Sequence, residues 1–240
     1  MALFAWGFVP GQILQTQANT APSSWQLIAA DAPMSTGADG ADLNLRRTYG
    51  LDQSLTTIHA LKAAAAAAPA GNSSVVPPGI AAPPGSPRYP VVLSPAEKQE
   101  LDYRITTLEP AERTPQLTSY LAAHSDTYGG LYLDHQAGGK VTFLFTTDVD
   151  TRRAELLTIF TASPDRLVVR QVASTDAQLN SAKDLLSADS SYLASIGLDE
   201  VSVDTVRNAV LLNGPGANTQ TLATLQARYG DLGVQVDLQP

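Results

Sequence analysis

One order of elements occurs twice between residues 128 and 240, and this repeat constrains the fold more than any other feature. In each copy a strand with an aspartate at or next to its end is followed by a turn, a second strand, a helix and a third strand. The first copy is predicted as strands 130–135 and 140–146, a helix from Asp148 or Asp150 to Phe160, and a strand 166–172. The second is predicted as strands 200–204 and 209–212, a helix capped by Asn218, and a strand 231–238. Repetition of one supersecondary unit predicts two tandem ββαβ units.

Alternation of apolar residues supports the predicted strands. Val141, Phe143 and Phe145 fall on one face of the second strand in the first copy. The last strand of the second copy alternates Leu232, Val234, Val236 and Leu238 with glycine or polar residues. A period of two residues is typical of a strand with one buried face.

Helix-capping signals place the remaining elements of the C-terminal part. Thr175-Asp-Ala-Gln178 is a capping box that opens a long linking helix, predicted over 175–196, and Gly197 ends it. Ser94-Pro95-Ala96-Glu97 is another, opening a helix over 96–108, and a short helix is predicted over 115–124. These helices are expected to cover the apolar faces of the sheets. The predicted fold class is α+β, with one domain at 92–240, units at about 128–173 and 199–240, and a linking helix at 175–196.

The N-terminal part is predicted to contain little regular structure. Residues 1–41 are interpreted as a disordered lead, 42–62 as a short helical segment interrupted at Gly50, and 63–91 as an Ala/Pro-rich linker. Two interpretations of the apolar start Met1–Val9 remain open. It is either a disordered apolar end or a signal peptide whose basic start is missing, because the first basic residue is Arg46.

Charge and composition narrow the classes of partner. The net charge of −8 arises entirely within residues 94–240, since the acidic and basic residues of 1–93 balance. An acidic domain repels phosphate backbones, so no nucleic-acid partner is expected. The chain has no cysteine, which excludes disulfides and thiolate chemistry. No apolar run is long enough to predict a membrane span.

No residue pattern in the sequence predicts catalysis. His124-Ser125-Asp126 has the residue types of a serine triad, but consecutive side chains do not converge on one point. A cation held by Asp134, His135, Asp148 and Asp150 is conceivable, although aspartates at a helix N-terminus are ordinarily caps. Gly214-Pro-Gly216 lacks the lysine and the spacing of a phosphate-binding loop. We therefore expect no catalytic residue, no cofactor and no metal site.

Several strings resemble the pro regions of secreted, mostly actinobacterial, chymotrypsin-like serine proteases of the α-lytic protease and streptogrisin type. The strings with this similarity are Tyr128–Asp134 with Gly139-Lys-Val141, Arg166–Val172 followed by Thr175–Leu186, Val201–Asp204 through Asn208, Leu45–Leu51, and Leu93–Glu97. The resemblance covers about residues 42–62 and 92–240, and its motifs are short and structural.

The resemblance implies a secreted, non-catalytic module. Such a pro region assists the folding of its protease and inhibits it, pairing a sheet edge with it and laying its C-terminal tail in the active cleft. The tail implied here is the strand 231–238 with its two following residues, and the implied partner-binding residues are Val234, Gln235, Val236, Asp237, Leu238, Gln239 and Pro240. No protease follows Pro240 in this sequence. A truncated protease precursor and a stand-alone extracellular binding scaffold therefore remain as alternatives.

Overall fold

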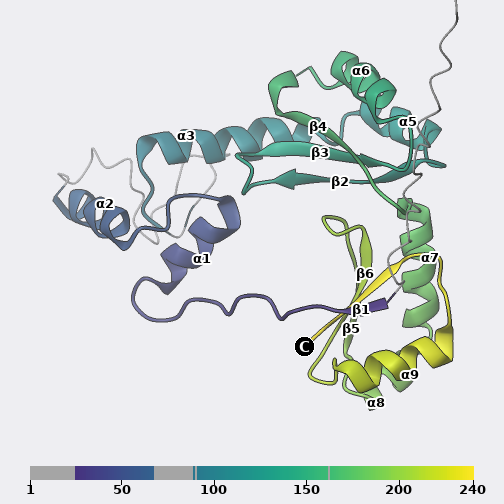
Figure 1. Ribbon diagram of the computed structural model, residues 1–240. Helices are drawn as coiled ribbons and strands as arrows, with labels where there is room; N and C mark the ends of the chain where they lie inside the picture. Colours follow the sequence, from purple (N-terminus) through teal and green to yellow (C-terminus); the bar gives the residue numbers. More distant parts are fainter. Residues whose placement is uncertain (1–24, 68–88, 90, 162) are drawn as a thin grey trace, which may run out of the picture.

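A computed structural model describes residues 25–67, 89, 91–161 and 163–240 (Figure 1). The fold is α+β, with two separate sheets and helices packed against them. The expected signal segment and most of the expected linker lie outside the described residues. Within the described residues, no helix is both long enough and apolar enough to span a membrane.

The first unit is a three-stranded sheet in the order β2-β3-β4. β2 (Tyr128–Asp134) runs antiparallel to β3 (Lys140–Phe145), and β4 (Leu167–Gln171) runs parallel to β3. α6 (Val149–Ile159) makes the crossover between β3 and β4. The alternating Val141, Phe143 and Phe145 are fully buried in one apolar cluster, as their period predicts.

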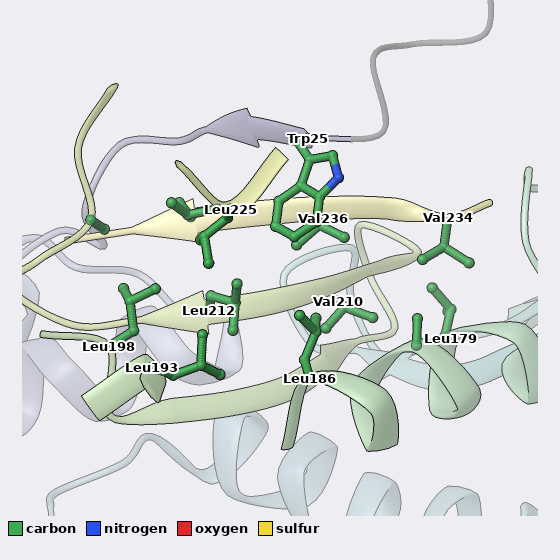
Figure 2. Close-up of a cluster of buried hydrophobic side chains, with 13 residues drawn as sticks. Trp25, Leu179, Leu186, Leu193, Leu198, Val210, Leu212, Leu225, Val234 and Val236 are labelled. Atoms are coloured by element: carbon green, nitrogen blue, oxygen red, sulfur yellow. The ribbon is translucent and has the colours of Figure 1, made fainter. Parts of the chain in front are cut away.

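The second unit repeats this topology. β5 (Glu200–Asp204) runs antiparallel to β6 (Ala209–Asn213), α9 (Thr219–Tyr229) follows, and β7 (Gln235–Gln239) runs parallel to β6. Val210, Leu212, Val236 and Leu238 belong to the second apolar cluster (Figure 2). The prediction of two tandem ββαβ units is confirmed.

The two strand-to-strand turns repeat the same hydrogen bond. Asp134 Oδ1 accepts from the amide of Ala137 (2.8 Å), and Asp204 Oδ1 accepts from the amide of Arg207 (2.9 Å). The residue before each second strand has a left-handed backbone, with φ 72° at Gly139 and 55° at Asn208. Asparagine tolerates this conformation better than most residues with a side chain. The duplication therefore extends to the turns.

The helical connection between the units is broken in two. The capping box at Thr175 is present, but α7 (Asp176–Ser187) ends before α8 (Ser190–Ser195), so the prediction of one helix over 175–196 is wrong. Asp189 lies at the break, where its carboxylate accepts hydrogen bonds from Arg228 (2.6 Å) and Tyr229 (2.8 Å) of α9. Beyond the break, Leu193 of α8 joins the second core.

Helices precede the two units, as predicted. They are α1 (Gly40–Tyr49), α2 (Leu55–Ala67), α3 (Pro95–Tyr103), a π-helical turn (Arg104–Leu108), α4 (Glu109–Ala111) and α5 (Pro115–Ala123). The Ser94–Glu97 capping box is present. Glu97 also accepts hydrogen bonds from the fully buried Arg46 of α1, which ties the first helix to the third.

Two predicted boundaries in the N-terminal part are wrong. The linker was expected from residue 63, but α2 continues to Ala67, because a run of alanines has the highest helix propensity. The disordered lead was expected to reach residue 41. Instead β1 (Trp25–Leu27) pairs in parallel with β7, giving a four-stranded sheet in the order β1-β7-β6-β5. The gain from burying Trp25 explains why this segment is ordered.

A buried asparagine connects the two units. Asn208, in the β5–β6 turn, accepts a hydrogen bond from the Ser174 amide (2.9 Å) and donates one to the Ser174 carbonyl oxygen (2.8 Å). Ser174 lies between β4 and α7 and is itself buried. This paired contact fixes the turn of the second unit against the end of the first.

Candidate functional site

The candidate partner-binding residues form the last strand and its flanks. Each β7 residue from Gln235 to Gln239 pairs with the adjacent β6, and three of them also pair with β1. β7 is therefore an interior strand of its sheet, as Figure 1 shows by the position of β1 beside it.

The burial of the predicted site residues follows from the interior position of β7. Five of the seven predicted site residues are buried, namely Val234, Val236, Asp237, Leu238 and Gln239, whereas Gln235 is partly exposed and Pro240 is exposed. That these residues bind a partner stays a prediction, but in this structure the strand has no free edge along Val236 to Leu238. The physical reason is that β1 occupies the outer edge, where it satisfies main-chain groups that an edge strand would expose.

A single side chain anchors β1. Trp25 is 2% exposed, and its indole Nε1 donates to the carbonyl oxygen of Gly230 (2.8 Å). Its ring stacks against that of Tyr229, with centroids 6.2 Å apart. Figure 2 shows Trp25 reaching from β1 toward Val236 in the core of the second unit.

The rest of β1 is held less firmly. Gln26 and Leu27 are both exposed. The amide of Ile28 donates to the carbonyl oxygen of Leu238 (2.8 Å), and residues 29–36 have no regular structure before α1. The edge of β7 is therefore covered by a three-residue strand that buries one large side chain.

The chemistry available at β7 is recognition by main-chain pairing. An extended segment gains affinity from main-chain hydrogen bonds to a strand edge and specificity from pockets for alternate side chains. Asp237 is fully buried, and its Oδ1 accepts a hydrogen bond from the side-chain Nε2 of Gln235 (2.8 Å). Asp237 Oδ2 has no hydrogen-bond partner among the described residues.

Among the described residues, His124 and His135 form no metal-holding group with the aspartates singled out in the sequence. His124 Nε2 lies 3.2 Å from Arg152 Nη1, and its ring packs against Tyr120. His135 packs against Tyr49 beside a hollow of about 620 Å³. Burial and the neighbouring Arg104 guanidinium lower the pKa of His135.

The other candidate motifs have structural surroundings. Asp148 has a left-handed backbone (φ 57°) at the start of α6 and makes no side-chain cap hydrogen bond, contrary to the expected cap. Gly214 and Gly216 pack against Ile196 and Gly197, where a Cβ atom would collide with backbone. Within the described ranges, no group of three or more histidine or acidic side chains is arranged to hold a metal ion.

Sequence reasoning missed β1 and its anchor. Trp25 and Leu27 alternate with Gln26, but three residues are too few to separate a strand from an irregular segment. An isolated tryptophan in a polar stretch was the available signal. Tryptophan buries more apolar surface than most residues and is rarely left without a contact.

A scan of the sequence against protein-family models finds no match, and a search of the curated proteins finds none either.

Proposed function

We propose that this chain is a secreted, non-catalytic module that binds a chymotrypsin-like serine protease, as an inhibitor or as a folding assistant. The observation that carries the proposal is the position of β7. It is the last strand of the second ββαβ unit, β1 is the described segment that pairs with its outer edge, and Pro240 beyond it is exposed. The exposed end of this otherwise buried strand is the part that a partner could reach, and recognition there would use the main chain of an extended segment.

Electrostatics support a basic partner. The domain after residue 93 carries the whole net charge of −8. Complementary charge speeds the encounter of two proteins and suppresses binding to like-charged ones. A protease with a basic face around its cleft would therefore be favoured over an acidic one.

Titration of the full chain into mature secreted bacterial chymotrypsin-like proteases tests the proposal. Residual activity toward a small chromogenic substrate is recorded for each protease in a panel. An equimolar amount should abolish the activity of at least one member and should protect its serine from a small covalent active-site reagent. Undiminished activity across the panel at large molar excess would contradict the proposal.

A matched pair of variants locates the contact. Pro240→Asp places a charge on the exposed tail and should weaken inhibition about tenfold, which is about 1.4 kcal/mol. Asp184→Asn changes an exposed side chain on α7 and should leave inhibition unchanged. Equal inhibition by both variants would place the contact away from the tail.

A stand-alone extracellular binding scaffold is the second candidate. The closed outer edge of β7 favours it, because a strand with two neighbours has no free main-chain groups along that edge. In this case the tandem units serve as a stable framework, and the ligand contacts another surface. Failure of the protease titration, with the fold intact by circular dichroism, would favour this function.

A further inference from the structure

β1 is an addition to the second unit rather than a part of the repeat. The topology of the first unit is complete with β2, β3, α6 and β4, and no described strand pairs with the outer edge of β4. The second unit has the same four elements in β5, β6, α9 and β7. β1 comes from a distant part of the chain and covers the outer edge of β7, the strand that corresponds to β4.

We propose that β1 is a detachable strand, and that the β7 edge beneath it is a binding site for an extended protein segment led by an aromatic residue. The site consists of the main chain of Val236 to Leu238 and the pocket filled by Trp25. The inference is independent of whether the partner is a protease, since it concerns only the form of the segment that the edge accepts.

The contacts of β1 define the chemistry of the partner segment. The first side chain enters the core beside Tyr229, and its N–H group meets the Gly230 carbonyl oxygen, so a tryptophan fits best. The next two side chains, Gln26 and Leu27, face solvent and need no particular identity. The segment runs parallel to β7. Recognition of one anchored side chain with main-chain pairing is a known mode of strand addition.

The covalent connection makes β1 a strong competitor. A tethered segment binds at an effective concentration of about millimolar, so a free segment is disfavoured while β1 is in place. The apparent affinity of the site for an external segment falls with the fraction of molecules in which β1 is detached. Loss of the Trp25 anchor should therefore raise that apparent affinity without changing the edge itself.

Hydrogen exchange in the unaltered full chain tests whether β1 detaches alone. The Ile28 amide bonds to Leu238 on one edge of β7 (2.8 Å), and the Gly214 amide bonds to Gln239 on the other (3.1 Å). After correction for intrinsic rates, Ile28 should exchange at least about tenfold faster than Gly214, through a local opening. Equal protection would show that β1 opens only with the whole sheet and would overturn the proposal.

Peptide binding tests the site itself. The probe is a labelled hexapeptide, Trp-Gln-Leu-Ile-Ala-Ala, with the sequence of residues 25–30, and binding is followed by fluorescence anisotropy. The Trp25→Ala full chain should bind it about tenfold more tightly than the unaltered chain. Replacing the peptide's tryptophan with alanine should remove most of this binding. Equal affinity of the two chains, or of the two peptides, would overturn the proposal.

Two further variants separate release of β1 from general damage. Ile28→Pro removes the amide that donates to the Leu238 carbonyl oxygen and should also raise peptide affinity, whereas Leu27→Ala changes an exposed side chain and should not. Circular dichroism and amide spectra should show Trp25→Ala folded. Unfolding of the second unit in that variant would make β1 an integral strand, which also overturns the proposal.

Discussion

β4 and β7 occupy equivalent positions in the two units, yet β4 is an outer strand and β7 an inner one. In β4 only Leu167 is buried, while four of the five residues of β7 are. β4 ends in the exposed Arg170 and Gln171, and a charged side chain discourages pairing at a sheet edge. The charged residue of β7, Asp237, is buried instead.

The difference teaches how one supersecondary unit is used in two ways. The first copy protects its third strand with polar side chains, and the second covers its third strand with a segment from elsewhere in the chain. Only in the second unit does the edge of the third strand, β7, become available when the covering strand β1 detaches. The copies therefore share topology and differ in their capacity to accept another strand.

The largest expected effect on stability concerns the third strand of each unit. Leu238 and Val169 occupy equivalent positions, but Leu238 is fully buried and Val169 only partly. Leu238→Ala should lower the free energy of unfolding by about 3 kcal/mol and Val169→Ala by about 1 kcal/mol. Urea denaturation measures both. Equal losses would mean that β4 is as well covered as β7.

A smaller effect is expected at the turns. Asn208→Ala leaves the buried amide and carbonyl of Ser174 unpaired and places alanine at a left-handed position. It should lower the free energy of unfolding by about 2 kcal/mol. Asn208→Gly loses the same hydrogen bonds but tolerates the left-handed backbone, so it should cost only about 1 kcal/mol. Thermal unfolding checks the order. A neutral Asn208→Ala would show that the contact between the units is dispensable.

The pH dependence of stability should have opposite signs at Glu112, which follows α4, and at Asp189, which lies between α7 and α8. Burial, with the nearby Glu109 carboxylate, raises the pKa of Glu112 to about 7, and hydrogen bonds from Arg228 and Tyr229 lower the pKa of Asp189. Glu112 therefore favours the folded state below its ordinary pKa of 4.5, and this stability is lost as the pH rises through about 7. Asp189 contributes above its ordinary pKa of 3.8, and that stability is lost as the pH falls through its lowered pKa.

Glu112→Gln measures the Glu112 contribution. Because the side chain is only partly buried, the substitution should add on the order of 1 kcal/mol at pH 8 and nothing at pH 4. Urea titrations at both pH values make the comparison. Asp189→Asn is the matched control, and it should destabilise the protein at pH 8. A gain from Glu112→Gln that does not vary with pH would refute the assignment.

The smallest expected effect is that of added metal ions. The turn at Asp134 and His135 in the first unit has an acidic counterpart at Asp204 in the second, and neither belongs to a metal-holding group among the described side chains. Calcium or zinc should shift the melting temperature by less than about 1 °C. A clear rise, removed by a chelator, would reveal a site that distinguishes the units.

The fold was largely predictable because its signals are local. The capping boxes at Ser94 and Thr175 placed two helix starts, and the alternation of Val141, Phe143 and Phe145 fixed a strand and its buried face. The break at Asp189 was not predictable, because it depends on contacts with α9, which lies about forty residues later.

The strand that holds the candidate residues was predictable, but its surroundings were not. The alternating Val234, Val236 and Leu238 indicate a strand, but a sequence pattern does not say whether that strand has a second neighbour. The second neighbour is β1, and Trp25 holds it in place through its contacts with Tyr229 and Gly230. Pairing between such distant segments leaves no periodic trace in either of them.

The parallel pairing of β1 with β7 has a consequence for synthesis on the ribosome. The Trp25 indole and the Gly230 carbonyl that receives its hydrogen bond are separated by 205 positions. Trp25 therefore leaves the ribosome early, but its binding partners in the second unit are translated only near the end of the described chain. The first unit is free to fold in the meantime. Closing so long a loop is slow. We expect the N-terminal strand to dock last, which leaves an interval in which a chaperone or another chain has access to it.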